Sequence, residues 1–104
     1  MNAPRIESVI PLQDKRLLVI FTNGVQKIYD CNRLMNLEPF QLLKHEAFFD
    51  AVKVDLGGYG VSWDDERDLS EYELWNNGVE VEQGTTSSKE GAVVQNGERG
   101  RSSR

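Results

Sequence analysis

Two glycine-containing turns, each between strand-like segments, constrain most strongly how this chain can fold. The apolar run at residues 16–22 (RLLVIFT) is followed by Asn23-Gly24, and Asn-Gly between two strand-like runs is the strongest short signal for a β-hairpin. We expect residues 25–30 to return antiparallel across this two-residue turn, with Val19 opposite Ile28. Because both faces of residues 16–22 are apolar, this strand should be central in its sheet or lie partly at an interface.

A second hairpin is indicated by Gly57-Gly58, which separates residues 51–56 (AVKVDL) from residues 59–63 (YGVSW). A shift of one residue would move every apolar side chain to the other face, so the alternating pattern fixes the register. A turn at the two glycines gives three apolar pairs on one face, namely Leu56 with Tyr59, Val54 with Val61, and Val52 with Trp63. Trp63 is therefore expected in the core.

The segments around the hairpins complete an α+β fold. Residues 5–12 form a strand in which alternation puts Ile6 and Ile10 on one face, and Pro11 confines this strand to a sheet edge or ends it. Residues 32–50 are expected to form one helix, with a possible break in its second half, over the apolar face of the sheet. The predicted fold is a small antiparallel sheet built from two hairpins, in the order β-β-β-α-β-β-α, covered on one face by short helices.

Composition divides the chain into a folded part and a tail. Residues 1–82 are expected to form a single domain, and residues 83–104 a disordered tail rich in glycine, serine and threonine. The only apolar residues of that tail are Ala92, Val93 and Val94. A segment this polar cannot bury enough apolar surface to offset the entropy of ordering its backbone.

Acidic residues are concentrated between Asp64 and Glu73. Six carboxylates and one arginine lie there, which accounts for a net charge of −5, equal to that of the whole chain. Much of this pattern is typical of a helix start, because Ser70 followed by Glu73 gives a capping box, in which each side chain bonds to the backbone N–H of the other residue. We therefore expect a helix that begins after Ser70 and ends at the next glycine.

The open alternative is that part of this acidic stretch binds another protein. Acids that do not cap the helix would then form a docking surface, with two aromatic residues of the helix as anchors. The candidate binding residues are Asp64, Asp65, Glu66, Asp68, Tyr72 and Trp75. A calcium site is not expected, because the stretch lacks the central glycine and the alternating oxygen ligands of a calcium loop.

Several other function classes are disfavoured. A single cysteine, Cys31, and a single histidine, His45, cannot supply a structural zinc site. No catalytic motif surrounds either residue, so we expect no catalytic residues, no metal and no cofactor. Cys31 is expected to be a small buried hydrophobe, and His45 a solvated helix residue.

Charge and hydrophobic patterning narrow the choice of partners and compartment. A net charge of −5 without a basic stripe disfavours direct nucleic-acid binding. No apolar run approaches the roughly 20 residues of a membrane span, so no membrane contact is expected. The N-terminus lacks the features of a signal peptide, which together with the single cysteine predicts a cytoplasmic protein.

Three stretches follow one another in a recognisable order, namely RIESVIPLQDKRLLVIFTNG, LLKHEAFFDAVKVD and GVSWDDERDLSEYELW. They carry the pattern PL-x-x-x-x-L-x-V-x-F-x-x-G, then F-x-x-V-x-V-D, then a tryptophan followed five residues later by Asp-Leu. Over about residues 5–75 the chain thereby resembles a small bacterial family known as domain of unknown function 2442. It departs from the family at turns, where His45-Glu46 replace a common Asp-Pro and Asp64-Asp65-Glu66 replace a common Pro-Asn-Gly.

The resemblance implies a compact α+β domain. Members look like companions of small toxin–antitoxin-type gene pairs, or are fused to helix-turn-helix domains, which this chain lacks. The leading hypothesis is a non-catalytic protein-interaction or regulatory module, such as part of a toxin–antitoxin-like pair. The alternatives are a small-molecule-binding or enzymatic domain with a pocket between sheet and helix, and a nucleic-acid-associated regulator that acts through a partner. Homodimerisation through the strand at residues 16–22 or an open sheet edge is also left open.

Overall fold

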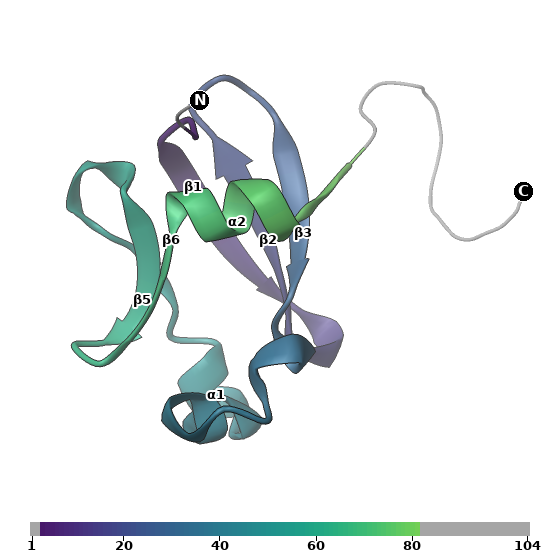
Figure 1. The fold of residues 1–104 in the computed structure, drawn as a ribbon, viewed down its shortest axis with the longest axis vertical. Helices are drawn as coiled ribbons and strands as arrows, with labels where there is room; N and C mark the ends of the chain where they lie inside the picture. Colours follow the sequence, from purple (N-terminus) through teal and green to yellow (C-terminus); the bar gives the residue numbers. More distant parts are fainter. Residues whose placement is uncertain (1–2, 82–104) are drawn as a thin grey trace, which may run out of the picture.

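The computed structural model describes residues 3–81, which form two small antiparallel sheets and a few short helices (Figure 1). The first sheet contains β1 (Ile6–Leu12), β2 (Arg16–Phe21), β3 (Gln26–Asp30) and β7 (Val79–Glu80), in the spatial order β1-β2-β3-β7. The second sheet contains β4 (Lys53–Val54), β5 (Gly60–Asp64) and β6 (Arg67–Ser70), in that order. The α-helices are α1 (Glu46–Phe49) and α2 (Glu71–Asn77).

The predicted α+β class is confirmed, but the prediction of one sheet is wrong. The two hairpins lie in different sheets, and each sheet gains a strand that the sequence analysis missed. Strand β6 forms within the acidic stretch, and β7 returns after α2 to pair with β3. The predicted disordered tail at residues 83–104 lies outside the described residues.

The first hairpin has a longer turn than predicted, which shifts its register by one residue. Leu18, and not Val19, lies opposite Ile28. Two hydrogen bonds close the turn: Gly24 N–H donates to Phe21 O, and Phe21 N–H donates to Val25 O. Within this turn only Gly24 has a positive φ, of 91°. This is a type I turn followed by a left-handed glycine. The two-residue turn that Asn-Gly predicted is of type I′, which needs positive φ at both central residues. Strand β2 is central, as predicted.

Strand β1 lies at a sheet edge, as Pro11 predicted, but a β-bulge interrupts its alternation. Ile6 pairs with Phe21, whereas Ser8 pairs with Ile20, so the register shifts between Ile6 and Ser8. An extra residue in one strand turns the following side chains to the opposite face. Ile6 therefore lies in the core, and Ile10 points away from it, against the expectation that they share a face.

In the second hairpin the predicted register is confirmed, but the predicted turn is wrong. Val54 pairs with Val61, as predicted. The chain then makes a 3₁₀ turn at Leu56–Gly58, in which both glycines have positive φ, of 82° and 77°. Leu56 is 98% exposed, so the predicted apolar pair of Leu56 with Tyr59 does not form.

The segment between the two hairpins is not one helix. It forms two 3₁₀ segments, Cys31–Leu34 and Glu38–Lys44, and the single turn α1, with a break at His45. His45 has an extended backbone conformation, with φ −86° and ψ 122°. The break was anticipated; the 3₁₀ geometry was not. Since 3₁₀ hydrogen bonds are weaker than α-helical ones, buried anchors such as Leu34 and Leu43 hold this segment in place.

The core lies between the inner face of the first sheet, the second sheet and the helices. Helix α2 crosses the front of the first sheet in Figure 1, where the Trp75 ring packs edge-on against Phe21 with 5.0 Å between centroids. Trp63 is buried, as predicted, and its Nε1–H donates to Phe49 O at 2.9 Å. No helix within residues 3–81 is long and apolar enough to cross a membrane.

Candidate functional site

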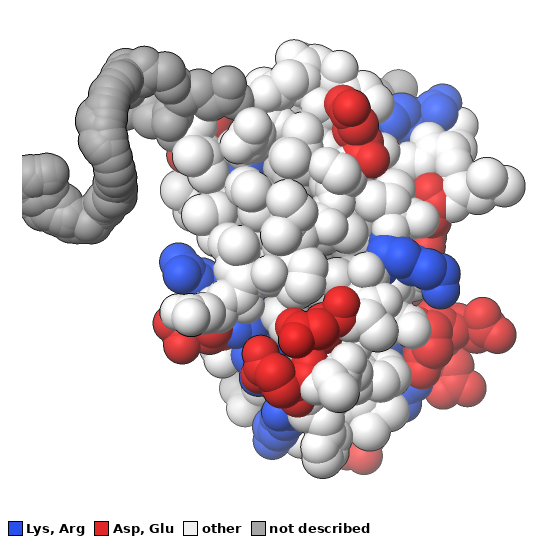
Figure 2. Space-filling model, turned by 180° about the vertical axis from the view of Figure 1, so that it is seen from behind, with Lys and Arg blue, Asp and Glu red and all other residues white. Residues whose placement is uncertain are grey.

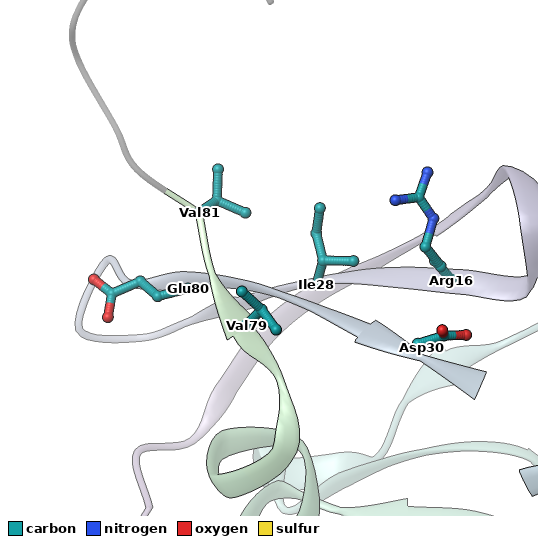
Figure 3. A pocket seen from close by; sticks show the side chains of 6 residues that line it. All are labelled: Arg16, Ile28, Asp30, Val79, Glu80 and Val81. Carbon is teal, nitrogen blue, oxygen red and sulfur yellow. The ribbon is translucent and has the colours of Figure 1, made fainter. Parts of the chain in front are cut away.

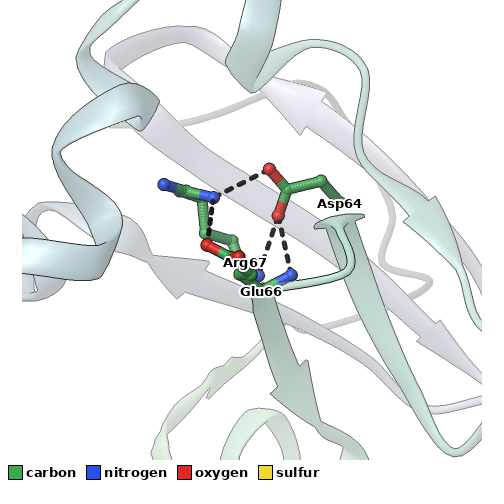
Figure 4. A network of polar contacts seen from close by, with 3 residues as sticks. All are labelled: Asp64, Glu66 and Arg67. Carbon is green, nitrogen blue, oxygen red and sulfur yellow. Dashed lines mark hydrogen bonds and ion pairs between the residues drawn. The ribbon is translucent and has the colours of Figure 1, made fainter.

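The first half of the acidic stretch closes the turn between β5 and β6. Asp64 Oδ1 accepts from the backbone N–H groups of Glu66 and Arg67 at 3.0 and 2.9 Å, and its Oδ2 accepts from Arg67 Nη1 at 2.8 Å (Figure 4). Glu66 Oε1 lies 3.7 Å from the same Arg67 nitrogen. Asp64 is thus a turn-forming residue, and Glu66 adds a weak, exposed ion pair.

The second half of the stretch starts α2. Ser70 is the N-cap, and its Oγ accepts from Glu73 N–H at 3.1 Å, which confirms the predicted helix start. The reciprocal bond of the capping box is replaced by a tertiary one, because Glu73 Oε2 accepts from the Tyr29 hydroxyl at 2.7 Å. Burial and the neighbouring Glu73 carboxylate raise the pKa of Tyr29 well above its ordinary value. Gly78 ends the helix, as predicted, with an extended backbone.

The two aromatic candidates have different surroundings. Tyr72 is 62% exposed. Trp75 is half-buried, and Lys27 lies above its ring with Nζ 4.0 Å from the centroid and also donates to Trp75 O. Asp65 and Asp68 are exposed. Of the six candidates, the structure brings Asp64 and Glu66 together around Arg67, and it places the Trp75 ring in contact with Phe21 and Lys27.

Cys31 and His45 do not form a reactive pair. Cys31 is fully buried, and burial raises the pKa of its thiol to about 12, with a smaller contribution from Asp30. This keeps the thiol protonated and unreactive at neutral pH. His45 is exposed, as expected. Within residues 3–81 no group of three His, Cys, Asp or Glu side chains is placed to hold a metal ion.

The surface that stands out is the face of the first sheet that points away from α2, which we call the outer sheet face. Alternation along β2 turns Leu17, Val19 and Phe21 into the core, so the residues between them point outward with their cross-strand partners. The aliphatic residues that the register places there are Ile10, Leu12, Leu18, Ile20, Ile28 and Val79. Val81, whose N–H donates to Gln26 O, extends this surface.

One row of the outer sheet face is aliphatic in all four strands. Ile10 pairs with Leu18, Leu18 with Ile28, and Ile28 with Val79. The outermost members of this row are the most accessible, with Ile10 44% and Val79 72% exposed. Seen from the side opposite α2, the molecule shows a broad uncharged surface, with charged side chains mostly around its rim and lower half (Figure 2). The largest apolar patch on a protein surface is often an interaction site.

A shallow groove of about 440 Å³ runs along this face beside β7. Ile28, Val81 and Arg16 point to the same side of the sheet, and Val79 and Asp30 lie beside them (Figure 3). Arg16 and Asp30 are cross-strand partners on β2 and β3, and Glu80 of β7 also lines the groove. The groove therefore has an apolar floor, with one basic and two acidic residues around it. The groove is on the outer side of the sheet, not between sheet and helix.

Sequence reasoning missed most of this surface. Its one signal was the doubly apolar pattern of β2, which predicted a central strand or an interface. The contributions of β1 and β7 depend on the bulge in β1 and on the pairing of β3 with β7, neither of which has a local signature.

Comparison with known proteins gives one match. The family described as "Protein of unknown function (DUF2442)" matches residues 6–80. No curated protein and no solved structure matches the chain. The match covers both sheets and α2, including the stretches on which the resemblance was noted. The chain belongs to the DUF2442 family of proteins of unknown function.

Proposed function

We propose that this chain is a non-catalytic protein-interaction module that docks a partner protein through the outer sheet face. The observation that carries the proposal is the aliphatic row that crosses all four strands of the first sheet on the side away from the core. A sheet that needs only one apolar face for its own core gains nothing in folding from a second one. An apolar patch retained on the other face is accounted for by a partner that covers it.

The chemistry of the partner follows from the chemistry of the face. The charged residues of the face are Arg16 and Asp30 in its cross-strand rows and Glu80 in the lining of its groove, so the partner surface is apolar at its centre and weakly charged at its rim. Nucleic acid does not fit this description, because its binding depends on clustered basic side chains. The proposal includes a regulatory role, for example as one half of a toxin–antitoxin-like pair. It also includes a cytoplasmic location, because the single cysteine, Cys31, is unpaired, as is usual in a reducing compartment.

Substitutions of exposed residues test the proposal with little risk to the fold. Ile10→Lys and Val79→Lys place charges at the two ends of the aliphatic row. Leu56→Lys is the matched control, because Leu56 is exposed on the turn between β4 and β5. Tyr72→Ala tests the acidic patch, the second docking surface predicted for the same function.

The measurement has two steps. Affinity purification from the native cell, with quantitative mass spectrometry, identifies proteins that wild type and Leu56→Lys retain and that Ile10→Lys loses. The purified candidate is then titrated against each variant in a calorimeter. We expect the Lys variants on the outer sheet face to weaken binding at least about ten-fold, since they bury an unpaired charge. Binding that is insensitive to Ile10→Lys and Val79→Lys would sink the proposal, and loss with Tyr72→Ala alone would move the site to α2.

A further inference from the structure

We propose that a second copy of this chain covers the outer sheet face, so that two four-stranded sheets pack face to face about a two-fold axis. The inference rests on the proposed function, because it assigns an occupant to the same surface. Its evidence is different, namely the distribution of charge over the chain and the order of residues across the sheet.

The charge distribution permits two copies to meet here. Each chain carries a net charge of −5, so most ways of bringing two copies together are opposed by repulsion. The six acids and one arginine between Asp64 and Glu73 carry a net charge of −5. They lie on β5, β6, the turn between these strands, and α2, not on the first sheet. The cross-strand rows of the outer sheet face carry Arg16 and Asp30, whose charges cancel, and Glu80 lines the groove only at the β7 edge. The outer sheet face can therefore approach its own copy without a net like-charge contact.

The order of residues across the sheet makes this face complementary to itself. In the order β1-β2-β3-β7, a two-fold axis parallel to the strands and between β2 and β3 places β2 opposite β3 of the second copy. Arg16 then faces Asp30 of the second copy, and Asp30 faces its Arg16, because the two residues are at the same level in the sheet. The interface gains two equivalent ion pairs from one symmetry operation.

The same operation matches the apolar rows. Leu18 faces Ile28 of the second copy, and Ile10 faces its Val79, since these four residues form one cross-strand row. Stacked sheets pack about 10 Å apart and about 30° from aligned, an offset that the long Arg16 side chain can span. A two-fold axis perpendicular to the strands would instead bring Arg16 and Asp30 against the row of Ser8, Ile20 and Gln26, which holds no charged residue.

The area of the outer sheet face sets the expected affinity of the dimer. Four strands about 4.8 Å apart, with five residues of about 3.4 Å each, give a footprint of roughly 19 by 17 Å, or about 300 Å² per copy. A standard stable interface buries about 800 Å² per partner. We therefore expect a weak, reversible dimer with a Kd of roughly 10–100 µM, which a specific partner protein can displace.

The full-length chain is the material for the first test. Sedimentation equilibrium from about 5 to about 500 µM should show a monomer–dimer equilibrium in this range. Ile10→Lys and Val79→Lys should each shift it toward monomer, and Leu56→Lys should leave it unchanged. A wild-type chain that stays monomeric throughout overturns the proposal, whether the face is then covered by residues 83–104 or left free. A dimer unaffected by both Lys variants on the face overturns it as well.

A charge-swap experiment tests the symmetry. Arg16→Asp should weaken self-association about ten-fold or more, because the introduced carboxylate would then face Asp30 of the second copy, and Asp30→Arg should do the same through two arginines. An equimolar mixture of the two variants should recover the wild-type affinity as a heterodimer, because position 16 of each variant then faces position 30 of the other, and both of these contacts are between opposite charges. Lys53→Asp on β4 changes the net charge by as much as Arg16→Asp does, away from the face, and should have little effect. A mixture as weak as the single variants overturns the proposed axis.

Circular dichroism of each variant controls for folding, since Asp30 Oδ1 also accepts from Asn32 N–H at 2.9 Å. The outcomes separate this inference from the proposed function. A monomeric chain whose partner binding is lost in Ile10→Lys refutes the dimer and leaves the proposed function standing. A chain that dimerises through the face and whose partner binding ignores the same substitution refutes the proposed function and leaves the dimer.

Discussion

Replacing Tyr29 with phenylalanine removes a hydrogen bond that ties the inner face of the first sheet to the first turn of α2. Tyr29 is fully buried, and its hydroxyl donates to Glu73 Oε2 at 2.7 Å. A hydrogen bond to a charged acceptor contributes about 1.5–3 kcal/mol. Glu73 is only half-buried, so water can partly replace the lost donor, and the expected loss is about 1.5 kcal/mol. For a domain of this size that is a fall in Tm of about 6–12 °C.

Urea denaturation followed by tryptophan fluorescence measures the effect, because Trp63 and Trp75 both lie against the core. Tyr72→Phe is the matched control. It makes the same chemical change at a residue that is 62% exposed, and should alter the free energy of unfolding by less than about 0.5 kcal/mol. A double-mutant cycle with Glu73→Ala, which removes the acceptor, should give a coupling energy of about 1 kcal/mol. Equal effects of Tyr29→Phe and Tyr72→Phe, or a coupling energy near zero, would refute the reasoning.

Three further predictions concern the cap, the cysteine and the turns. Ser70→Ala removes the N-cap acceptor of Glu73 N–H and should lower the free energy of unfolding by about 1 kcal/mol; an unchanged urea midpoint would contradict the cap. Burial raises the pKa of Cys31 from 9.0 to about 12, so its stabilising contribution is complete below about pH 9 and is lost as pH rises toward 12. Unfolding free energies measured between about pH 8 and 10.5 should therefore fall more steeply for wild type than for Cys31→Ala, and parallel curves would disprove this. Gly58→Ala puts a Cβ 2.5 Å from Ile6 O at a φ of 77° and should cost about 3 kcal/mol. Gly24→Ala, with no atom within 4 Å of the new Cβ, should cost only about 1 kcal/mol from its positive φ. Equal thermal shifts for the two glycine variants would show that crowding at Gly58 is unimportant.

Local signals were sufficient for part of the fold. The strand pattern of residues 16–22, the pairing of Val54 with Val61 and the cap at Ser70 were all predicted, because each depends on residues close together in the chain. The turn at Gly24 was placed correctly, but its length was wrong by one residue. Asn-Gly suits both a type I′ turn and a type I turn with a glycine bulge, and the flanking apolar residues of β2 tolerate either register.

The candidate site was less accessible to sequence reasoning. The acidic stretch attracted notice because its charges are adjacent in the chain, yet Asp64 and Glu73 form hydrogen bonds within the domain. The outer sheet face is dispersed over β1, β2, β3 and β7. Each strand contributes only one to three of its residues, so no window of the sequence looks like a binding site.

The sequence by itself determined the local units of this protein, namely where strands turn, where α2 begins and which family the chain belongs to. Tertiary structure alone decided that the two hairpins lie in separate sheets and that β7 completes the first of them. It also decided that the bulge in β1 turns Ile10 outward to join Leu18, Ile28 and Val79. The physical reason is the separation along the chain of the residues that interact. Turn and cap preferences arise from hydrogen bonds between residues a few positions apart. Strand partners and exposed faces depend on which distant segments together bury the most apolar surface.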